Sequence, residues 1–459
     1  MGPISPETNP WDSPIDSCRP IKVICIGAGI SGILAGIRFP QRIKNLDFTI
    51  YEKNIDVGGT WFENRYPGLG PDFSCHAYQY TFASNPNWSR FYPPGKEIQE
   101  YLQGVARKYN VKKYIRFAHL FKSAEWLEES GKWEITLERL CDKEVIKDHA
   151  DVLLKATGLL NTWHWPDISG LHDFKGKLLH SADWDESYNP NNGTVAVIGY
   201  GPSGMQIIPA LQPLVKSMQC YVRGKSWIAQ YGPGADELKE RGGGDNFEHS
   251  IEEIRQFNEN PETYLQFRHK VEGALNKAQF VTFRGTEANK AFSEATDKWM
   301  KDALVKRPDI YESLKPDYPV ACRRLFPGSR FLEALIRDNV EFIPKEIKHI
   351  TTTGIEDEDG VFRKADTIIC ATGFDPPLNA NESPIIGKGG TTLSQIWDPS
   401  PSAYLSMCPE KMPNFYIFLG PNSVPSAGST IYMIESYCEY MIKCVQKLQR
   451  ERLKSMTIS

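Results

Sequence analysis

The sequence has no Cys-x-x-Cys pair, no long apolar run and no basic tail or stripe. Its ten cysteines are scattered over 459 residues, which argues against a zinc site or a redox dithiol and favours reduced thiols in the cytoplasm. No stretch approaches the roughly 18 continuous apolar residues of a membrane span. The polar, proline-rich residues 1–20 lack the apolar core of a signal peptide and are expected to form an N-terminal extension.

The net charge of -4, from 53 basic and 57 acidic residues, gives no reason to expect a nucleic-acid partner. No metal ion is expected, and the oligomeric state has no signal in the sequence.

A glycine-rich turn follows the first predicted strand. Residues 21–26 form a short apolar run typical of a buried strand; a G-x-G-x-x-G fingerprint comes next, and a helix is predicted through about residue 39. Gly27 makes the tight turn, Gly29 lets the backbone approach a pyrophosphate, and Gly32 lets helix and strand pack closely. Glu52 stands 20 residues after Gly32, at the end of the next predicted strand, where an acid accepts hydrogen bonds from a ribose diol. The pattern predicts a dinucleotide site.

The same pattern starts again in the middle of the chain. A strand predicted over 194–198 runs into a second fingerprint that includes Gly199, Gly201 and Gly204. Its next predicted strand ends on Arg223, and a cation there favours the 2'-phosphate of NADP over the bare diol of NAD. The alternative is that Arg223 is merely a solvated surface residue. A nicotinamide site beside a flavin site is the usual reason for two such turns in one chain, so we expect FAD and NADPH as cofactors.

Alternating strands and helices predict an α/β fold with parallel sheets, made of two Rossmann-like dinucleotide-binding domains and a helical insertion. We predict that residues 21–165 and 350–459 form the FAD-binding domain. Residues 166–230 and 320–349 are predicted to form the NADPH-binding domain, and 231–319 to form the insertion within it.

A longer motif lies between the two fingerprints. Residues 174–185 read F-x-G-x-x-x-H-x-x-x-W-D, with His180 and Trp184 at two of the fixed positions. This resembles the signature of type I Baeyer–Villiger monooxygenases, members of the class B flavoprotein monooxygenases. Within that family the sequence is most similar to fungal secondary-metabolism members. Tyr or Phe in place of Trp184 would instead resemble the N- and S-oxygenating members.

The resemblance extends over nearly the whole chain and implies further site residues. Residues 58–68 are similar to the family segment that packs against the flavin, 201–206 to its NADP turn, and 371–375 to its late A-T-G motif. These segments supply the following implied cofactor-binding residues: Gly59, Thr60, Trp61, Ser203, Gln206 and Gly373.

The catalytic residues are implied by the same resemblance. Arg324, in Cys322-Arg323-Arg324-Leu325, matches the family's catalytic arginine, and Arg323 matches its second contact to the 2'-phosphate. Asp72, after the N-R-Y-P-G run, matches the aspartate that orients the arginine beside the flavin. A structural ion pair elsewhere is the alternative for Arg324 and Asp72, and a structural hydrogen-bond donor is the favoured interpretation of His180. The chain departs from the family at residues 69–71, at Leu325 in place of proline, and in ending soon after the last predicted helix.

The implied reaction is a Baeyer–Villiger oxidation. A C4a-peroxyflavin would insert one oxygen atom of O2 into a ketone, here a hydrophobic natural-product intermediate, and yield an ester or lactone. N- or S-hydroxylation by the same machinery is one alternative. The other is a flavin-binding pathway partner without turnover.

Overall fold

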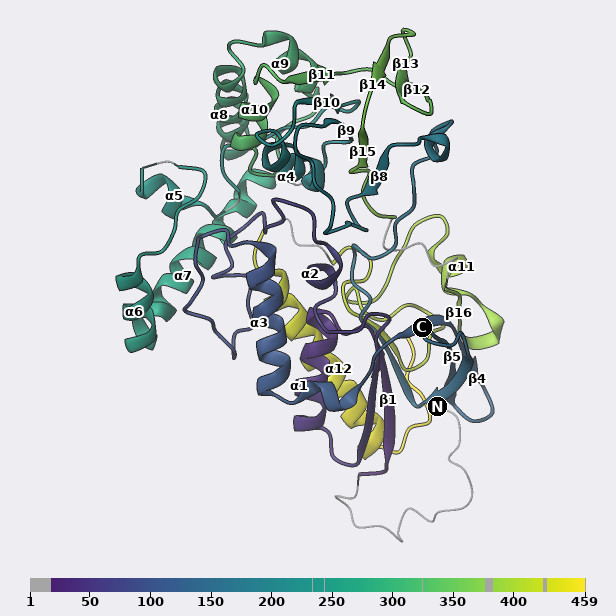
Figure 1. Ribbon diagram of the computed structural model, residues 1–459. Helices are drawn as coiled ribbons and strands as arrows, with labels where there is room; N and C mark the ends of the chain where they lie inside the picture. Colours follow the sequence, from purple (N-terminus) through teal and green to yellow (C-terminus); the bar gives the residue numbers. More distant parts are fainter. Residues whose placement is uncertain are drawn as a thin grey trace.

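The computed structural model describes residues 18–232, 234–242, 244–323, 325–375, 383–423 and 427–458. Two parallel sheets organise these residues into two units, one at the bottom and one at the top of Figure 1. The expected α/β fold with two Rossmann-like units is therefore confirmed. The first sheet has the order β17 (Phe415–Ile417), β7 (Val152–Lys155), β1 (Ile21–Ile26), β2 (Leu46–Tyr51) and β3 (Ile115–Arg116).

The first sheet is covered by a different layer on each face because its strands alternate. Val23 and Cys25 of β1 face a core shared with the helices, whereas Ile24 and Ile26 face a core shared with an antiparallel sheet. The helices are α1 (Ile30–Arg42), α3 (Gly95–Lys108) and α12 (Thr430–Arg450), and the short α2 (Thr60–Glu63) lies before α3. The antiparallel layer contains β4 (His119–Leu127), β5 (Lys132–Arg139) and β6 (Val145–Ala150), with β16 (Ile385–Ile386) added parallel to β4, and α11 (Leu393–Trp397) follows β16.

The second sheet also has five strands, and its outer strand β8 precedes the fingerprint strand, whereas β17 of the first sheet comes last in the chain. It runs β8 (Lys177–His180), β15 (Thr367–Cys370), β9 (Thr194–Ile198), β10 (Ser217–Tyr221) and β11 (Val340–Ile343), with all pairs parallel. The helices α4 (Pro202–Leu211) and α10 (Ser329–Leu335) pack on it, and a small antiparallel sheet of β12 (Ile347–Ile350), β13 (Gly354–Asp357) and β14 (Phe362–Lys364) covers its other side.

The predicted domain boundary at residue 350 is wrong. The strand β15, expected in the FAD-binding domain, pairs with β9 and β8 of the second sheet. Its four residues are all buried there. The chain therefore returns to the first unit only after β15, whose apolar side chains pack into the cores on both faces of the second sheet.

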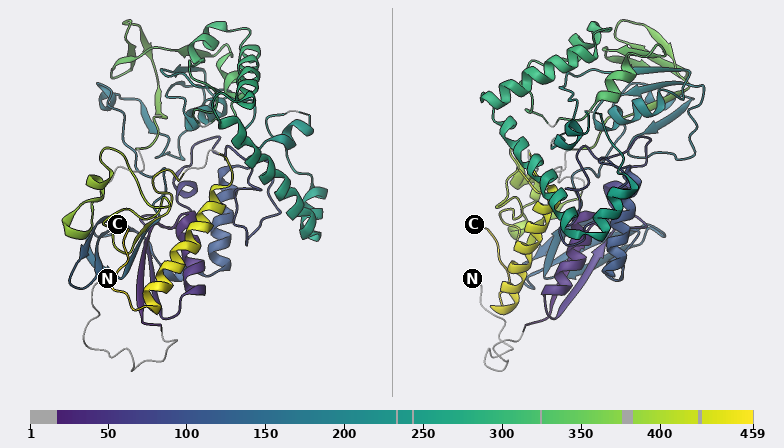
Figure 2. Two further views of the ribbon diagram at one scale, coloured as in Figure 1. Left: turned by 180° about the vertical axis from the view of Figure 1, so that it is seen from behind. Right: turned by 90° about the vertical axis from the view of Figure 1, so that its left-hand side faces the viewer.

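The helical insertion spans both units. Its helices are α5 (Asp236–Glu240), α6 (Ile251–Glu259), α7 (Pro261–Lys277), α8 (Glu287–Ala303) and α9 (Pro308–Leu314). Met300 and Leu304 pack into the core of the second unit. Val271 and Leu275 of α7 instead pack with Phe73 and Phe91 from the first unit. Figure 2 shows α7 and α8 reaching from one unit to the other. In the described ranges no helix is long and apolar enough to cross a membrane.

Two linkers connect the units side by side. The first follows β7 and the second follows β15, and each begins with an Ala-Thr-Gly sequence. The backbone N–H of Asp375 donates to the carbonyl of Thr162 at 2.9 Å. The carboxylate of Asp375 lies 2.6 Å from His164 Nε2. These contacts therefore fix the two linkers to each other where they pass between the sheets.

Candidate functional site

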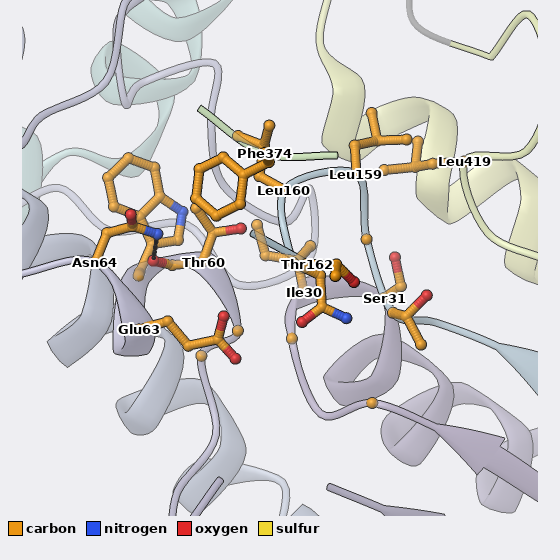
Figure 3. Close-up of a pocket in the computed structure, with 18 of the residues that line it drawn as sticks. Ile30, Ser31, Thr60, Glu63, Asn64, Leu159, Leu160, Thr162, Phe374 and Leu419 are labelled. Carbon is orange, nitrogen blue, oxygen red and sulfur yellow. Dashed lines mark hydrogen bonds between the residues drawn. The ribbon is translucent and has the colours of Figure 1, made fainter. Parts of the chain in front are cut away.

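One cavity of about 1050 Å³ lies between the two units. It begins at the carboxyl end of β1, passes α2 and both linkers, and reaches the first turn of α4. Figure 3 shows Thr60 and Asn64 near α2 on one side, and Leu159 and Leu419 on the other. A cleft at the carboxyl ends of parallel strands is the usual ligand position in this kind of fold.

The first glycine turn opens this cavity. Gly27 has φ +104°, and a Cβ there would lie 2.6 Å from the carbonyl oxygen of Ala156. A Cβ at Gly32 would lie 1.9 Å from the carbonyl oxygen of Gly27, so both positions require glycine. Gly29 caps α1 without a side-chain hydrogen bond, and no acid lies in the first turn. The free N–H groups and positive helix end suit a pyrophosphate.

Glu52 lies beside this turn and is 4% exposed. Its Oε2 accepts from the backbone N–H of Ala28 at 2.6 Å, and its Oε1 accepts from that of Asn54 at 2.8 Å. Burial raises the pKa of Glu52, and the two backbone donors oppose this rise. The carboxylate is thus fixed in position, and each of its oxygens keeps further acceptor capacity for the hydroxyls of a ribose.

The second glycine turn repeats the geometry of the first. Gly199 has φ +97°, and a Cβ there would lie 2.6 Å from the carbonyl oxygen of Ala371. A Cβ at Gly204 would lie 2.3 Å from the carbonyl oxygen of Gly199, whereas Gly201 has open space around it. The N-terminus of α4 has no side-chain cap and no acid in its first turn. It offers the same kind of anion site as α1.

Two of the predicted phosphate contacts lie on the rim of this second turn. Arg223 and Arg323 are both exposed. The guanidinium of Arg323 lies 5.0 Å from the centre of the Tyr318 ring, and Tyr318 Oη donates to the carbonyl of Lys225 at 3.0 Å. Arg323 also lowers the pKa of Tyr200, which burial raises. The segments that carry the two arginines are therefore neighbours beside the fingerprint.

The structure places most of the other predicted residues on the cavity wall. Ser203 and Gln206 reach it from α4, and Asp72 reaches it from the loop after α2. The remaining predicted residues on the wall are Gly27, Gly29, Glu52, Gly59, Thr60, Trp61 and Gly373. Predicted residues outside its described lining are Gly32, Gly199, Gly201, Gly204, Arg223 and Arg323. Arg324 lies outside the described residues.

His180 has a structural position rather than an acid–base one. Its Nδ1 accepts from the backbone N–H of Ala182 at 3.1 Å, so the proton lies on Nε2, which is 3.2 Å from Thr372 Oγ1. The Trp163 ring stacks on the imidazole with centroids 4.2 Å apart and an interplanar angle of 11°. Burial lowers the pKa of His180 to about 4, so the ring is neutral at physiological pH.

Several lining residues were not predicted from the motifs, and three of them are Trp163, Tyr66 and Phe326. Trp163 follows the first Ala-Thr-Gly sequence, and an aromatic pair at that place, Trp163 and Trp165, was the available signal. Tyr66 belongs to the N-R-Y-P-G run, but the sequence does not indicate that its hydroxyl donates to Gln206. Phe326 comes two residues after Arg324 and also lines the cavity. In the described ranges no cluster of three metal-ligating side chains occurs.

The fold and the cavity define a protein with two dinucleotide-binding units that share one site. A family model described as flavin-binding monooxygenase-like matches residues 20–232. The FAD-binding monooxygenase tazF of Aspergillus terreus is 40% identical over 447 residues, which cover 96% of this chain and 78% of tazF. A Baeyer-Villiger monooxygenase of Pseudomonas aeruginosa is 30% identical over 442 residues, which cover 96% of this chain and 80% of that protein.

Solved structures show the same likeness. The OTEMO complex with FAD and NADP has a TM-score of 0.81 at 25% identity, over 96% of this chain and 86% of that one. Cyclohexanone monooxygenase from Rhodococcus sp. Phi1 bound to NADP+ has a TM-score of 0.79 at 25% identity, over 96% and 87%. The chain belongs to the flavin-binding monooxygenase-like family. It is a flavin monooxygenase, and Baeyer–Villiger monooxygenases are among its relatives, as the signature at residues 174–185 led us to expect.

Proposed function

We propose that the protein is an FAD- and NADPH-dependent Baeyer–Villiger monooxygenase that converts a hydrophobic ketone into an ester or lactone. The observation that carries this proposal is that one cavity joins Gly29, Asp72 and Ser203. It connects a first dinucleotide turn, the aspartate expected beside the flavin, and a second dinucleotide turn. The names of the relatives support the same reaction.

The first unit fits FAD. Gly29 and Gly59 approach each other so closely that a Cβ on Gly59 would lie 3.0 Å from the Cα of Gly29, which leaves bare backbone facing the cavity. The N-terminus of α1 would bind the pyrophosphate, and Glu52 would accept from the ribose. Thr60 and Trp61, at the start of α2, would lie against the ring system.

The second unit fits NADPH. The N-terminus of α4 would bind its pyrophosphate, and Arg223 and Arg323 would bind the 2'-phosphate. Their exposure on the rim suits a charged group that enters from solvent. Ser203 and Gln206 then mark the end of the cavity where the nicotinamide side approaches the first unit.

When bound, FAD reduced by NADPH supplies the electrons that activate O2. Arg324 keeps its charge at every relevant pH, so it would stabilise the oxyanion that develops on the substrate. One preorganised donor of this kind contributes roughly 3–4 kcal/mol to lowering the barrier. Asp72 would orient the guanidinium through a charge-assisted hydrogen bond.

The cavity walls favour an apolar substrate. Trp163, Phe326 and Phe374 line the space next to the linkers, and Phe73 and Tyr78 line it near Asp72. Walls of this kind exclude water, which protects reactive intermediates from hydrolysis or collapse. We also propose a cytoplasmic location, because the scattered cysteines, with no Cys-x-x-Cys pair, are typical of thiols that stay reduced in that compartment.

The test is product analysis under isotopically labelled O2 with the FAD-loaded protein, NADPH, a panel of cyclic and aromatic ketones, and one thioether. One labelled oxygen atom in an ester or lactone is the expected result. Sulfoxide without any ester would assign the protein to S-oxygenation instead. Flavin that is reduced but yields no oxygenated product from any member of the panel would contradict the proposal.

A further inference from the structure

One side-chain amide joins the second unit to the loop that carries Asp72. Gln206, on α4, accepts a hydrogen bond at its Oε1 from the hydroxyl of Tyr66 at 2.9 Å. Its Nε2 donates to the carbonyl of Gly70, also at 2.9 Å. Tyr66 and Gly70 belong to the segment after α2, residues 64–72, which we call the Asp72 loop. A single residue of the second unit therefore holds this loop of the first unit at two points.

The orientation of the amide is determined by its partners. A backbone carbonyl can only accept, so Nε2 of Gln206 must face Gly70, and Oε1 must face Tyr66. Ser203, one turn earlier on α4, forms a side-chain hydrogen bond with Tyr66 that opposes the burial-driven rise of the Tyr66 pKa. The carboxylate of Asp72 adds to that rise.

The backbone of the loop also lies directly on α4. Gly68 has φ +83°, and a Cβ there would lie 2.5 Å from the carbonyl oxygen of Gln206 and 3.2 Å from Cβ of Ala210. The backbone N–H of Gly95 donates to the carbonyl of Leu69 at 2.8 Å, so the start of α3 holds the loop from the other side.

We propose that Gln206 is a positioning residue that couples occupancy of the second dinucleotide turn to the placement of Asp72. This inference rests on the proposed function. The free N–H groups of the α4 N-terminus and the side chains of Ser203 and Gln206 share the first turns of one helix. A dinucleotide phosphate bound at that end stabilises these turns, and their hydrogen bonds to Tyr66 and Gly70 pass the effect to the Asp72 loop. Coupling of this kind is reciprocal, so the loop in turn favours the bound dinucleotide.

Amide hydrogen exchange of the FAD-loaded protein tests the coupling without any turnover. Saturating NADP+ is expected to slow exchange in peptides covering residues 66–72 by about two- to tenfold, the range of one or two net hydrogen bonds. Gln206→Glu keeps the size of the side chain and the acceptor for Tyr66, but it places a carboxylate oxygen against the carbonyl of Gly70. Gln206→Glu and Gln206→Leu are both expected to abolish the protection while keeping the flavin spectrum.

Gln212→Leu is the matched control. Gln212 follows the C-terminal end of α4, and its amide donates to Asn339 Oδ1 at 2.7 Å, away from the cavity. This variant is expected to retain the protection by NADP+. The proposal is overturned if the wild-type loop does not respond to NADP+, or if Gln212→Leu loses the response as fully as Gln206→Leu.

A second measurement separates positioning from simple structural support. In Gln206→Glu, at saturating NADPH, ester formed per NADPH oxidised is expected to fall by about fivefold or more, a larger factor than the loss in the rate of flavin reduction, because the displaced Asp72 loop acts on the oxygenation step. Equal losses in both quantities would overturn the positioning role. A loop that responds to NADP+ in a protein that makes no ester would instead contradict the proposed reaction and leave the coupling intact.

Discussion

The Nε2 atoms of His76 and His249 lie 2.9 Å apart in a region without solvent. His76 belongs to the first unit and His249 to the segment before α6, so the pair joins the insertion to the first unit. Two imidazole nitrogens at this distance can share only one proton, so the contact requires at least one neutral acceptor. Burial lowers the pKa of both rings, and that of His76 lies well below its usual range.

Charged and titratable groups surround the pair on every side. Tyr264 Oη lies 3.1 Å from His76 Nδ1, and Arg268 donates to the backbone carbonyl of His76 at 3.1 Å. The charges of Arg268 and Arg241 further lower the pKa of His76. Glu253 lies 3.7 Å from His249 Nδ1 and partly opposes the lowering of the His249 pKa. Both rings are therefore neutral at pH 7.

The first prediction concerns acid stability. Since the folded pKa values of His76 and His249 lie below the unfolded value of about 6.5, the unfolded chain binds more protons below that pH. The stabilisation is complete above about pH 6.5 and is lost as the pH falls. As the pH falls below 6.5, each histidine should reduce the free energy of unfolding by up to about 1.4 kcal/mol per pH unit, until the pH reaches its folded pKa. Thermal unfolding of the FAD-loaded protein between pH 8 and pH 5 measures this.

His249→Gln is the informative variant for this prediction. Glutamine can still donate to His76 but does not titrate, so the acid loss should become less steep. His269→Gln, at an exposed position of α7, is the control and should retain the wild-type slope. A wild-type slope in His249→Gln would contradict the assignment.

The second prediction concerns the first dinucleotide site. Glu52→Gln replaces a carboxylate that accepts from Ala28 and Asn54 with a group that has only one acceptor oxygen. Hydrogen bonds to charged groups contribute about 1.5–3 kcal/mol, so FAD should bind roughly ten- to a hundredfold more weakly. Fluorescence titration of the apoprotein with FAD measures the change.

Glu435→Gln is the control for this site. Glu435 also accepts from two donors, the backbone N–H and hydroxyl of Thr81, at 2.8 and 2.6 Å. It is not among the described residues of the cavity wall. FAD affinity should be unchanged there, and an equal loss in both variants would show that Glu52 acts only through stability.

Local sequence signals predicted the two units well because the glycine turns are local structures. The φ values of Gly27 and Gly199, and the close approach of each to an Ala-Thr-Gly segment, follow from the strand–turn–helix pattern. The position of β15 could not be predicted in the same way. Its partners β8 and β9 lie more than 160 residues earlier in the chain, and strand adjacency over such a distance leaves no periodic signal.

Side-chain contacts between the two units also could not be predicted from the sequence. Tyr66 and Gln206 are 140 residues apart, and each was visible only as part of its own motif. Gln206 was predicted to bind cofactor, and its motif gave no indication that its amide also bonds to Tyr66 and Gly70. The stacking of Trp163 on His180 depends on the path of the first linker, which contains no regular secondary structure.

The third prediction concerns the choice of nicotinamide cofactor. Arg223→Ala should raise the KM for NADPH by at least about tenfold, the effect of one lost charge-assisted contact to a phosphate, and leave the KM for NADH nearly unchanged. Lys216→Ala, an exposed cation just before β10 at the opposite end of that strand, is the control. Equal effects on NADPH and NADH would exclude a role for Arg223 at the 2'-phosphate.

The fourth prediction concerns the oxygenation step. Arg324→Ala should retain FAD and still oxidise NADPH, but lose oxygenated product by about 10²- to 10³-fold, because the donor for the developing oxyanion is removed. Asp72→Asn keeps the shape of the side chain but removes the charge that orients Arg324, so a smaller loss is expected.

The double variant Arg324→Ala, Asp72→Asn should lose little more product than Arg324→Ala alone, since Asp72 is expected to act through the arginine. Ester and hydrogen peroxide formed per NADPH measure these effects, with Arg307→Ala, on the surface before α9, as the control. Independent, fully additive losses would show that Asp72 has a role separate from Arg324.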